Sequence, residues 1–221
     1  MKKRTFVIFS FLLLVFVSCT HTKTEYYPDG ETKKSALQYK GKELDGVSKW
    51  WYPNGNLQME FSYKKGKLNG PSLRWFNGGI KQSEENFIND LREGRSIFYD
   101  EKGNQVSEAY YLHDTLNGPF REWHMNGRLK LEGNYKMGRF NGRWKYYTEN
   151  SFQVGEGIFK NGTGIQRGWY ENGKTKREIH YKDGLKDGIE ISYHPDGTIE
   201  SKMNYLKGKP VIDAGHGNDK K

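Results

Sequence analysis

Seven aromatic side chains recur along the chain at a nearly constant spacing, each five residues after a glycine. They are Trp51, Trp75, Tyr99, Trp123, Tyr147, Trp169 and Tyr193. A row of partly exposed rings can stack on sugar rings, on protein side chains or on the bases of single-stranded nucleic acid. The same rings could instead serve the fold alone, by covering the backbone and packing against their neighbours. This ladder is therefore the candidate binding site, with a purely structural role as the alternative.

A second row consists of glutamates at matching positions of the same pattern. They are Glu60, Glu84, Glu108, Glu132, Glu156 and Glu178, and Lys202 ends the row. If the chain forms two strands per repeat, equivalent positions lie about 9.5 Å apart, whereas calcium ligands lie about 2.3 to 2.6 Å from one ion. The row therefore does not predict a metal site. We expect ion pairs with lysines and arginines on the intervening strands, or alternatively an acidic stripe that recognises a basic partner.

The residues that could carry catalysis do not converge. His124 and His194 share one position of the pattern, but they are three repeats apart, about 29 Å in a meander of strands. The sequence has no HExxH, CxxC, Walker or nucleophile-elbow motif. We therefore expect no catalytic residues, no metal and no cofactor.

The N-terminus has the features of an export signal. Lys2, Lys3 and Arg4 precede an uncharged apolar run from Phe6 to Val17, too short for the roughly 20 residues of a membrane-spanning helix. Cys19 is the one cysteine, and Ser18-Cys19 after the run resembles the lipobox of bacterial lipoproteins, with Phe16 where that motif usually has leucine. The resemblance implies a signal peptide over residues 1–18, lipid attachment at Cys19 and an anchor with a short linker over 19–25. An ordinary signal peptide with a chance cysteine is the alternative.

The elements that position these side chains are marked by two sets of glycines. The first set is Gly30, Gly55, Gly79, Gly103, Gly127, Gly173 and Gly197, with Ser151 in the remaining position. The second set is Gly46, Gly70, Gly94, Gly118, Gly142, Gly164 and Gly188. A spacing near 24 residues indicates a repeat array, and two turns per period predict two strands per repeat.

Residue alternation within each repeat indicates strands with one covered face. Leu57, Met59, Phe61 and Tyr63 alternate with polar residues. From Gly55 onward, the eighth residue after each turn position of the first set, Ser151 included, is again aromatic. These residues are Tyr63, Phe87, Tyr111, Tyr135, Phe159, Tyr181 and Tyr205.

We therefore predict an all-β protein, an open single-layer antiparallel meander of about eight two-stranded repeats, or about sixteen strands. The array is expected over residues 26–209, followed by a flexible tail over 210–221. One repeat is two residues shorter at 159–164, which predicts a tightened hairpin with unchanged strand faces.

The repeat unit resembles the MORN repeat variant of many bacterial proteins. The resemblance is carried by segments such as Tyr63 to Glu84 and Tyr135 to Glu156, and it covers Tyr26 to Pro210. It implies an open antiparallel sheet. Many such proteins are described as antitoxin-like, and recognition of membrane lipids is often suggested for the wider class.

Together these patterns predict a non-enzymatic, lipid-anchored envelope protein whose sheet binds or scaffolds a protein partner. The segment from Thr20 to Lys23 has no acidic cluster of the kind that resembles a surface-export signal, which favours a periplasm-facing location. Export also makes a nucleic-acid partner unexpected. An antitoxin or immunity protein that neutralises a toxin, and a protein that binds cell-wall glycan, remain the alternatives.

Overall fold

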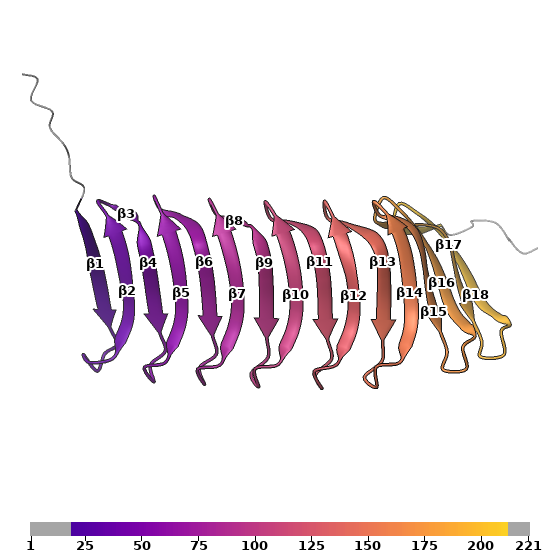
Figure 1. The fold of residues 1–221 in the computed structure, drawn as a ribbon, viewed down its shortest axis with the longest axis horizontal. Helices are drawn as coiled ribbons and strands as arrows, with labels where there is room; N and C mark the ends of the chain where they lie inside the picture. Colours follow the sequence, from indigo (N-terminus) through magenta and orange to yellow (C-terminus); the bar gives the residue numbers. More distant parts are fainter. Residues whose placement is uncertain (1–18, 212–221) are drawn as a thin grey trace, which may run out of the picture.

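The computed structural model describes residues 19–211, which form one open antiparallel sheet without helices (Figure 1). Its nineteen strands are β1 (Thr20–Tyr26), β2 (Lys33–Lys40), β3 (Glu43–Leu44), β4 (Gly46–Trp51), β5 (Leu57–Lys64), β6 (Lys67–Trp75), β7 (Lys81–Ile88), β8 (Leu91–Arg92), β9 (Gly94–Tyr99), β10 (Gln105–Leu112), β11 (Thr115–Trp123), β12 (Leu129–Lys136), β13 (Arg139–Tyr147), β14 (Gln153–Lys160), β15 (Thr163–Trp169), β16 (Thr175–Lys182), β17 (Leu185–Tyr193), β18 (Ile199–Leu206) and β19 (Lys209–Val211). Within residues 19–211 there is accordingly no helix long and apolar enough to cross a membrane.

The strands follow one another in sequence order, which confirms the predicted meander. β3 and β4 both pair with β2, and β8 and β9 both pair with β7. If β3 and β4 are counted as one interrupted strand, and β8 and β9 as another, the number of strands falls from nineteen to seventeen. This is close to the sixteen expected.

The structure corrects the predicted limits of the array. Residues expected as a short linker form β1, whose pairing with β2 begins at Thr20 opposite Lys40. At the other end β19 includes Pro210 and Val211, which were expected in the flexible tail. The predicted signal peptide, residues 1–18, and residues 212–221 lie outside the described part of the chain.

The first glycine set forms the turns at the lower edge of the sheet in Figure 1, as predicted. In the turn at Gly55, the Gly55 amide donates to the Tyr52 carbonyl at 2.9 Å and the Tyr52 amide to the Asn56 carbonyl at 2.8 Å. Gly55 has a φ of 84°, a left-handed conformation that glycine adopts without steric cost. Ser151 fills the same place with a φ of 67°.

The second glycine set does not form the turns at the upper edge, contrary to expectation. The hairpin between β5 and β6 turns at Lys65 and Gly66, whose φ angles are 51° and 75°. Gly70, with a φ of 114°, lies instead in a β-bulge where the pairing of β5 with β6 shifts register between Phe61 and Tyr63. A bulge inserts unpaired residues into one strand and increases the local twist.

The short repeat lacks this bulge. Between β14 and β15 the pairing runs without a shift from Phe159 opposite Gly164 to Gly155 opposite Gly168. The turn keeps two residues, Asn161 and Gly162, with positive φ angles. The expected tightened hairpin is therefore wrong, because the two residues are missing from the bulge. The predicted strand faces are retained, since Phe159 packs with the aromatic row at 5.6 Å from Tyr181.

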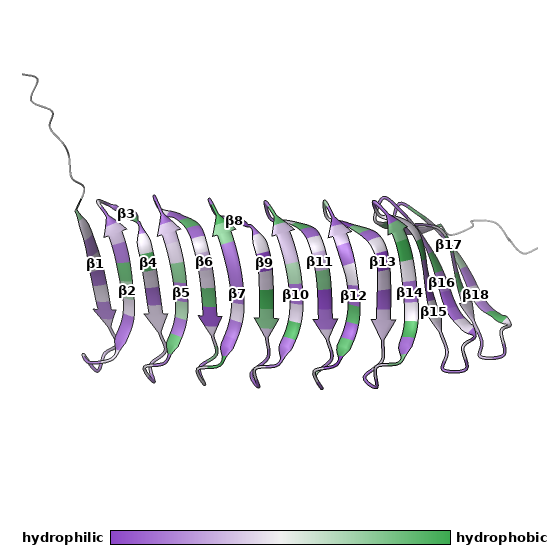
Figure 2. Ribbon diagram, viewed as in Figure 1, coloured by the Kyte–Doolittle hydropathy of each residue, from purple (hydrophilic) through white to green (hydrophobic). Residues whose placement is uncertain are grey.

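The sheet has two different faces, because successive residues of a strand point to opposite sides. Hydrophilic and hydrophobic residues follow one another in bands along the strands (Figure 2). The tyrosine face carries the row from Tyr63 to Tyr205 and the central Phe61, which lies between Ser48 and Ser72 of the adjacent strands. These two serines are 0% and 2% exposed, because large side chains on neighbouring strands cover them. The opposite face carries the predicted glutamate row and is called the ladder face below.

The most compact packing lies on the tyrosine face around Trp144, which is 2% exposed. Its ring lies 4.9 Å from that of Tyr135 and 4.8 Å from that of Phe140, both edge to face. Trp144 fits because Gly133 on β12 and Gly157 on β14 flank it; a Cβ atom on Gly133 would lie 2.1 Å from the indole. Glycines on the neighbouring strands thus leave room for a large ring between them, and the ring is buried although no second layer covers the sheet.

Beyond β14 the row of strands turns away from the plane of the preceding strands (Figure 1). Across this bend, Arg139 Nη1 lies 2.8 Å from Asp183 Oδ1, although 44 residues separate them. Phe140 likewise approaches Tyr181, with ring centroids 6.1 Å apart. A Cβ atom on Gly162 would lie 2.5 Å from the Gly184 amide nitrogen, so glycine permits the close approach of two hairpins. The sheet therefore bends toward its tyrosine face at the repeat without a bulge.

Candidate binding surface

All seven ladder residues are the last residues of their strands, at the lower edge of the ladder face. They end β4, β6, β9, β11, β13, β15 and β17, and every one is half-buried. A register shift accompanies each of them, as between Trp50 and Trp51 or between Arg74 and Trp75. Trp50 faces Phe61 on the tyrosine face, so the adjacent Trp51 belongs to the opposite face. The ladder rings therefore share one face, as the sequence predicts.

The ladder and the glutamate row lie on the same face. The Tyr99 hydroxyl donates to Glu84 Oε1 at 3.2 Å, and the Tyr147 hydroxyl donates to Glu132 Oε1 at 3.1 Å. These two tyrosines are thus held by the preceding repeat. Within residues 19–211 the indole nitrogens of the four ladder tryptophans and the hydroxyl of Tyr193 make no hydrogen bond, so these groups are left for a partner.

The glutamates of the row are engaged in ion pairs, as expected. Lys49 Nζ lies 2.8 Å from Glu60 Oε2, and Arg167 Nε lies 2.6 Å from Glu178 Oε2, in both cases across adjacent strands. Glu84 differs, because its partner Lys81 is on its own strand. Because these carboxylates are already paired with lysines and arginines, they do not support the alternative of an acidic stripe that recognises a basic partner.

Glu108 is the most enclosed member of the row, with 5% of its surface exposed. Arg95 Nε lies 2.5 Å from Oε1 and Arg121 Nη1 lies 2.9 Å from Oε2. Burial opposes ionisation, but the hydrogen bonds from the two guanidinium groups outweigh it and hold the pKa of Glu108 below its ordinary value. Glu108 is therefore an ionised structural link between three strands.

Side chains connect several pairs of neighbouring lower-edge turns. The Tyr52 hydroxyl donates to the carbonyl of Trp75 at 2.9 Å, and the Tyr170 hydroxyl donates to that of Tyr193 at 2.7 Å. Asn54 donates to the Asn77 carbonyl of the next turn at 3.1 Å. These bonds fix the ends of the ladder strands that they join.

His124 belongs to the same set of connections, because its Nε2 lies 2.9 Å from the Tyr147 carbonyl oxygen. His180 lies 3.0 Å from Glu178. Within residues 19–211, no group of three or more His, Cys, Asp or Glu side chains is arranged to hold a metal ion.

Cys19, the predicted lipid attachment site, is exposed at the upper edge. Its carbonyl oxygen accepts a 3.4 Å hydrogen bond from the Gly41 amide in the neighbouring hairpin. The strand β1 starts at the next residue. The Cys19 side chain is thus connected to the sheet without an intervening loop.

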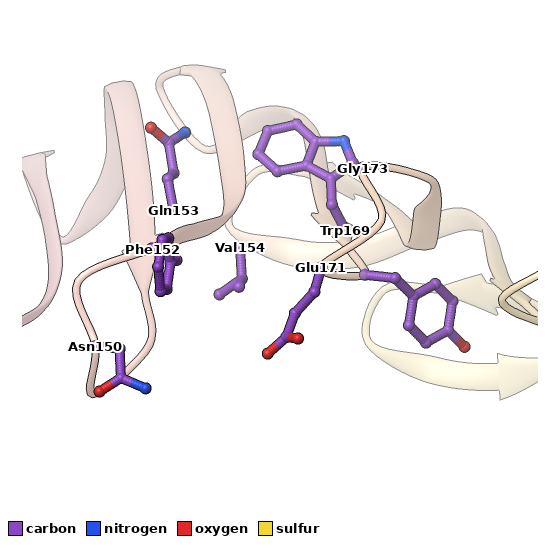
Figure 3. Close-up of a pocket in the computed structure, with 8 residues that line it drawn as sticks. Asn150, Phe152, Gln153, Val154, Trp169, Glu171 and Gly173 are labelled. Atoms are coloured by element: carbon purple, nitrogen blue, oxygen red, sulfur yellow. The ribbon is translucent and has the colours of Figure 1, made fainter.

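A recess of about 630 Å³ opens at the lower edge where the sheet bends (Figure 3). It lies between the turns that follow β13 and β15, and Trp169 of the ladder lines it. The other lining residues are Asn150, Phe152, Gln153, Val154, Tyr170, Glu171 and Gly173. The sequence marks this place only through the short repeat and Ser151, and neither feature indicates a recess.

The fold and this surface define the class of repeat arrays built from two-stranded units in a single-layer sheet. Residues 44–65, 163–183 and 186–207 match the family described as MORN repeat variant, and each match includes one lower-edge hairpin. The chain therefore contains units of the MORN repeat variant type in these three segments. No curated protein matches the chain.

Proposed function

We propose that this protein is a non-enzymatic, lipid-anchored envelope protein whose ladder face binds a protein partner. The observation that carries the proposal is the row of half-buried rings along one edge of that face. A single-layer sheet has no second layer to cover these rings, and contiguous apolar stripes on a protein surface commonly mark interaction sites. Aromatic side chains are also enriched where proteins bind one another.

The distribution of charge supports attachment to a membrane at the upper edge. The connections at this edge contain thirteen lysines and arginines against seven aspartates and glutamates, over residues 40–45, 64–69, 88–93, 112–117, 136–141, 160–164, 182–187 and 206–209. The lower-edge connections contain three against seven, over residues 27–32, 52–56, 76–80, 100–104, 124–128, 148–152, 170–174 and 194–198. A lipid on Cys19 would bring the basic edge to the membrane, where anionic head groups attract lysine and arginine. The lower edge, with the ladder, would then face away from the lipid.

Mass spectrometry of the protein extracted from membranes tests the anchor. We expect residues 1–18 to be absent and Cys19 to carry the lipid, while a Cys19→Ser variant should remain unmodified and be released into the soluble fraction. A free Cys19 thiol in the mature protein, or a mature N-terminus at another residue, would refute lipid anchoring. Two or more acyl chains are needed for stable membrane attachment, so the number of chains should be read from the mass.

The ladder is tested with the double variant Trp75→Ala and Trp123→Ala. The partner is first identified by affinity purification of the full-length protein from envelope extracts, and its recovery is then compared between variants. We expect reduced recovery with an unchanged circular dichroism spectrum. Phe98→Ala removes a 36%-exposed ring from the tyrosine face and should leave recovery unchanged.

Undiminished recovery by a folded double variant would place the partner elsewhere on the sheet. Loss of the folded spectrum would show that the two rings are structural only. If the purified partner is a toxin whose activity the protein blocks, the same surface makes the protein an immunity protein, which is the alternative function.

A further inference from the structure

We propose that the recess at the bend binds a neutral oligosaccharide. This inference does not depend on the protein partner proposed above. It concerns the gap between the turn of residues 148–152 and the turn of residues 170–174, called the bend recess below. Four observations carry it: the missing connections between these turns, the free polar groups that result, the chemistry of the lining and the volume.

At the bend recess no side chain of one turn bonds to the next, as is also the case between the turns of residues 76–80 and 100–104 and between those of 100–104 and 124–128. Asn126 and Asn172 each donate to a backbone carbonyl of the next turn, at 2.9 and 3.1 Å. Asn150 occupies the equivalent place, and its side-chain amide makes no hydrogen bond within residues 19–211. Thr148 holds the position of Tyr52 and Tyr170, whose hydroxyls donate to the next repeat. Its own hydroxyl instead accepts a 3.2 Å hydrogen bond from the Phe152 amide of the same turn. The two turns are therefore free to lie apart.

The lining combines a flat apolar surface with hydrogen-bonding groups. Trp169 and Val154 are half-buried, and Phe152 is 68% exposed. In Figure 3, Val154 lies between Phe152 and Trp169, and Glu171 extends from the opposite turn. The aliphatic C–H groups of a sugar ring can pack on an indole, while its hydroxyls bond to amides and carboxylates.

The polar groups of the bend recess select against anionic ligands. Glu171 contributes a carboxylate, Asn150 and Gln153 contribute neutral amides, and none of the lining residues is lysine, arginine or histidine. The Gln153 amide nitrogen donates to the Gly155 carbonyl at 3.3 Å, which leaves its oxygen as an acceptor. A phosphate or an acidic sugar would face an uncompensated carboxylate, so the ligand is neutral or cationic.

The volume of the recess distinguishes a neutral ligand from a cationic one. Rings beside a carboxylate could also hold the ammonium or guanidinium group of a partner protein. A volume of about 630 Å³ is within the range of sites for whole small molecules, about 300 to 1,000 Å³, and one side-chain terminus would leave most of it empty. A short chain of neutral sugar rings fills such an open recess and uses both its apolar and its polar sides.

Isothermal titration of the full-length, detergent-extracted protein tests the inference. The probes are the tetramers of β-1,4-linked N-acetylglucosamine and of β-1,4-linked glucose. We expect at least one to bind, and Trp169→Ala to weaken it by about tenfold or more through loss of stacking. Trp75→Ala removes the equivalent ladder ring of another repeat and should leave the affinity unchanged.

Two exposed substitutions keep the test independent of folding. Asn150→Ala and Glu171→Ala remove side chains that are exposed, so both variants should fold and both should bind the tetramer more weakly. Absence of binding by both tetramers at millimolar concentration would overturn the proposal. So would binding that Trp169→Ala, Asn150→Ala and Glu171→Ala all leave unchanged, or binding of a tetra-arginine peptide but of neither tetramer. Loss of the protein partner in the ladder variant would not affect these outcomes.

Discussion

Truncation of Tyr135 should destabilise the sheet far more than truncation of Tyr205, although both hold the same position of the repeat. Tyr135 lies in the middle of the array, with the rings of Phe120 and Phe140 each 5.4 Å away and that of Trp144 at 4.9 Å. Tyr205 lies in the last complete repeat, where the ammonium group of Lys186 lies 4.8 Å from the ring centre. Each repeat contacts only its neighbours, so a central ring has partners on two sides and a terminal ring on one.

The size of the difference follows from these contacts. Truncation of a fully buried aromatic residue to alanine costs about 3 to 5 kcal/mol, and each aromatic pair contributes about 0.5 to 1.5 kcal/mol. Because Tyr135 is half-buried, Tyr135→Ala should cost about 3 kcal/mol. Tyr205→Ala loses part of one ring surface and one exposed cation–π contact, about 1 kcal/mol in total.

Urea denaturation followed by far-ultraviolet circular dichroism measures the two losses. A difference of about 2 kcal/mol corresponds to a shift of about 1 M urea between the midpoints of the two variants. Tyr135→Phe is the control, because it keeps the ring and removes a hydroxyl that makes no hydrogen bond within residues 19–211. Its midpoint should stay close to that of the parent protein. Equal losses for the two alanine variants would refute the nearest-neighbour argument and indicate a closed or globular core.

Two further substitutions test the tyrosine face. Burial raises the pKa of Glu85, so its ionised form opposes folding above that pKa and the effect disappears below its ordinary value; Glu85→Gln should raise the urea midpoint at pH 7 and leave it unchanged near pH 3. A higher midpoint at both pH values, or at neither, would contradict this assignment. Gly133→Ala should cost about 1 to 3 kcal/mol, because the new methyl group would overlap the Trp144 ring, whereas Gly168→Ala, with its nearest atom 3.6 Å from the new Cβ, should be close to neutral in the same urea assay. Equal effects of the two substitutions would show that the Trp144 ring yields without cost.

The repeat architecture could be predicted because turn chemistry and alternation act locally. A turn such as that at Gly55 requires a positive φ, which restricts the residue type, and the alternation from Leu57 to Tyr63 requires one covered face. The role of Gly70 could not be predicted in the same way. A positive φ is needed in a hairpin turn and also in a bulge, so the residue type does not distinguish the two.

The shared face of the ladder and the glutamates depends on register, which the residue types alone do not determine. Tyr99 reaches Glu84 because the shift between β9 and β10 and the pairing of β7 with β9 bring the two side chains together. The bend of the sheet could not be predicted from the residue types either. It results from a bulge that is missing and from backbone contacts at Gly162 and Gly164, where a side chain would collide with neighbouring backbone atoms.

The range of the contacts between repeats bears on how the chain acquires its structure. The side-chain bonds that join neighbouring lower turns span 21 to 24 residues, as from Tyr27 to Trp51, and the Arg139–Asp183 pair across the bend spans 44. Proteins dominated by such local contacts fold quickly, because little chain entropy is lost before each contact forms. An emerging chain can therefore complete one repeat as soon as the next two dozen residues are available. The contacts across the bend form only after a further repeat has been synthesised, because Asp183 lies 44 residues after Arg139. The strands before β13 can therefore be folded before Tyr181 and Asp183 reach Phe140 and Arg139.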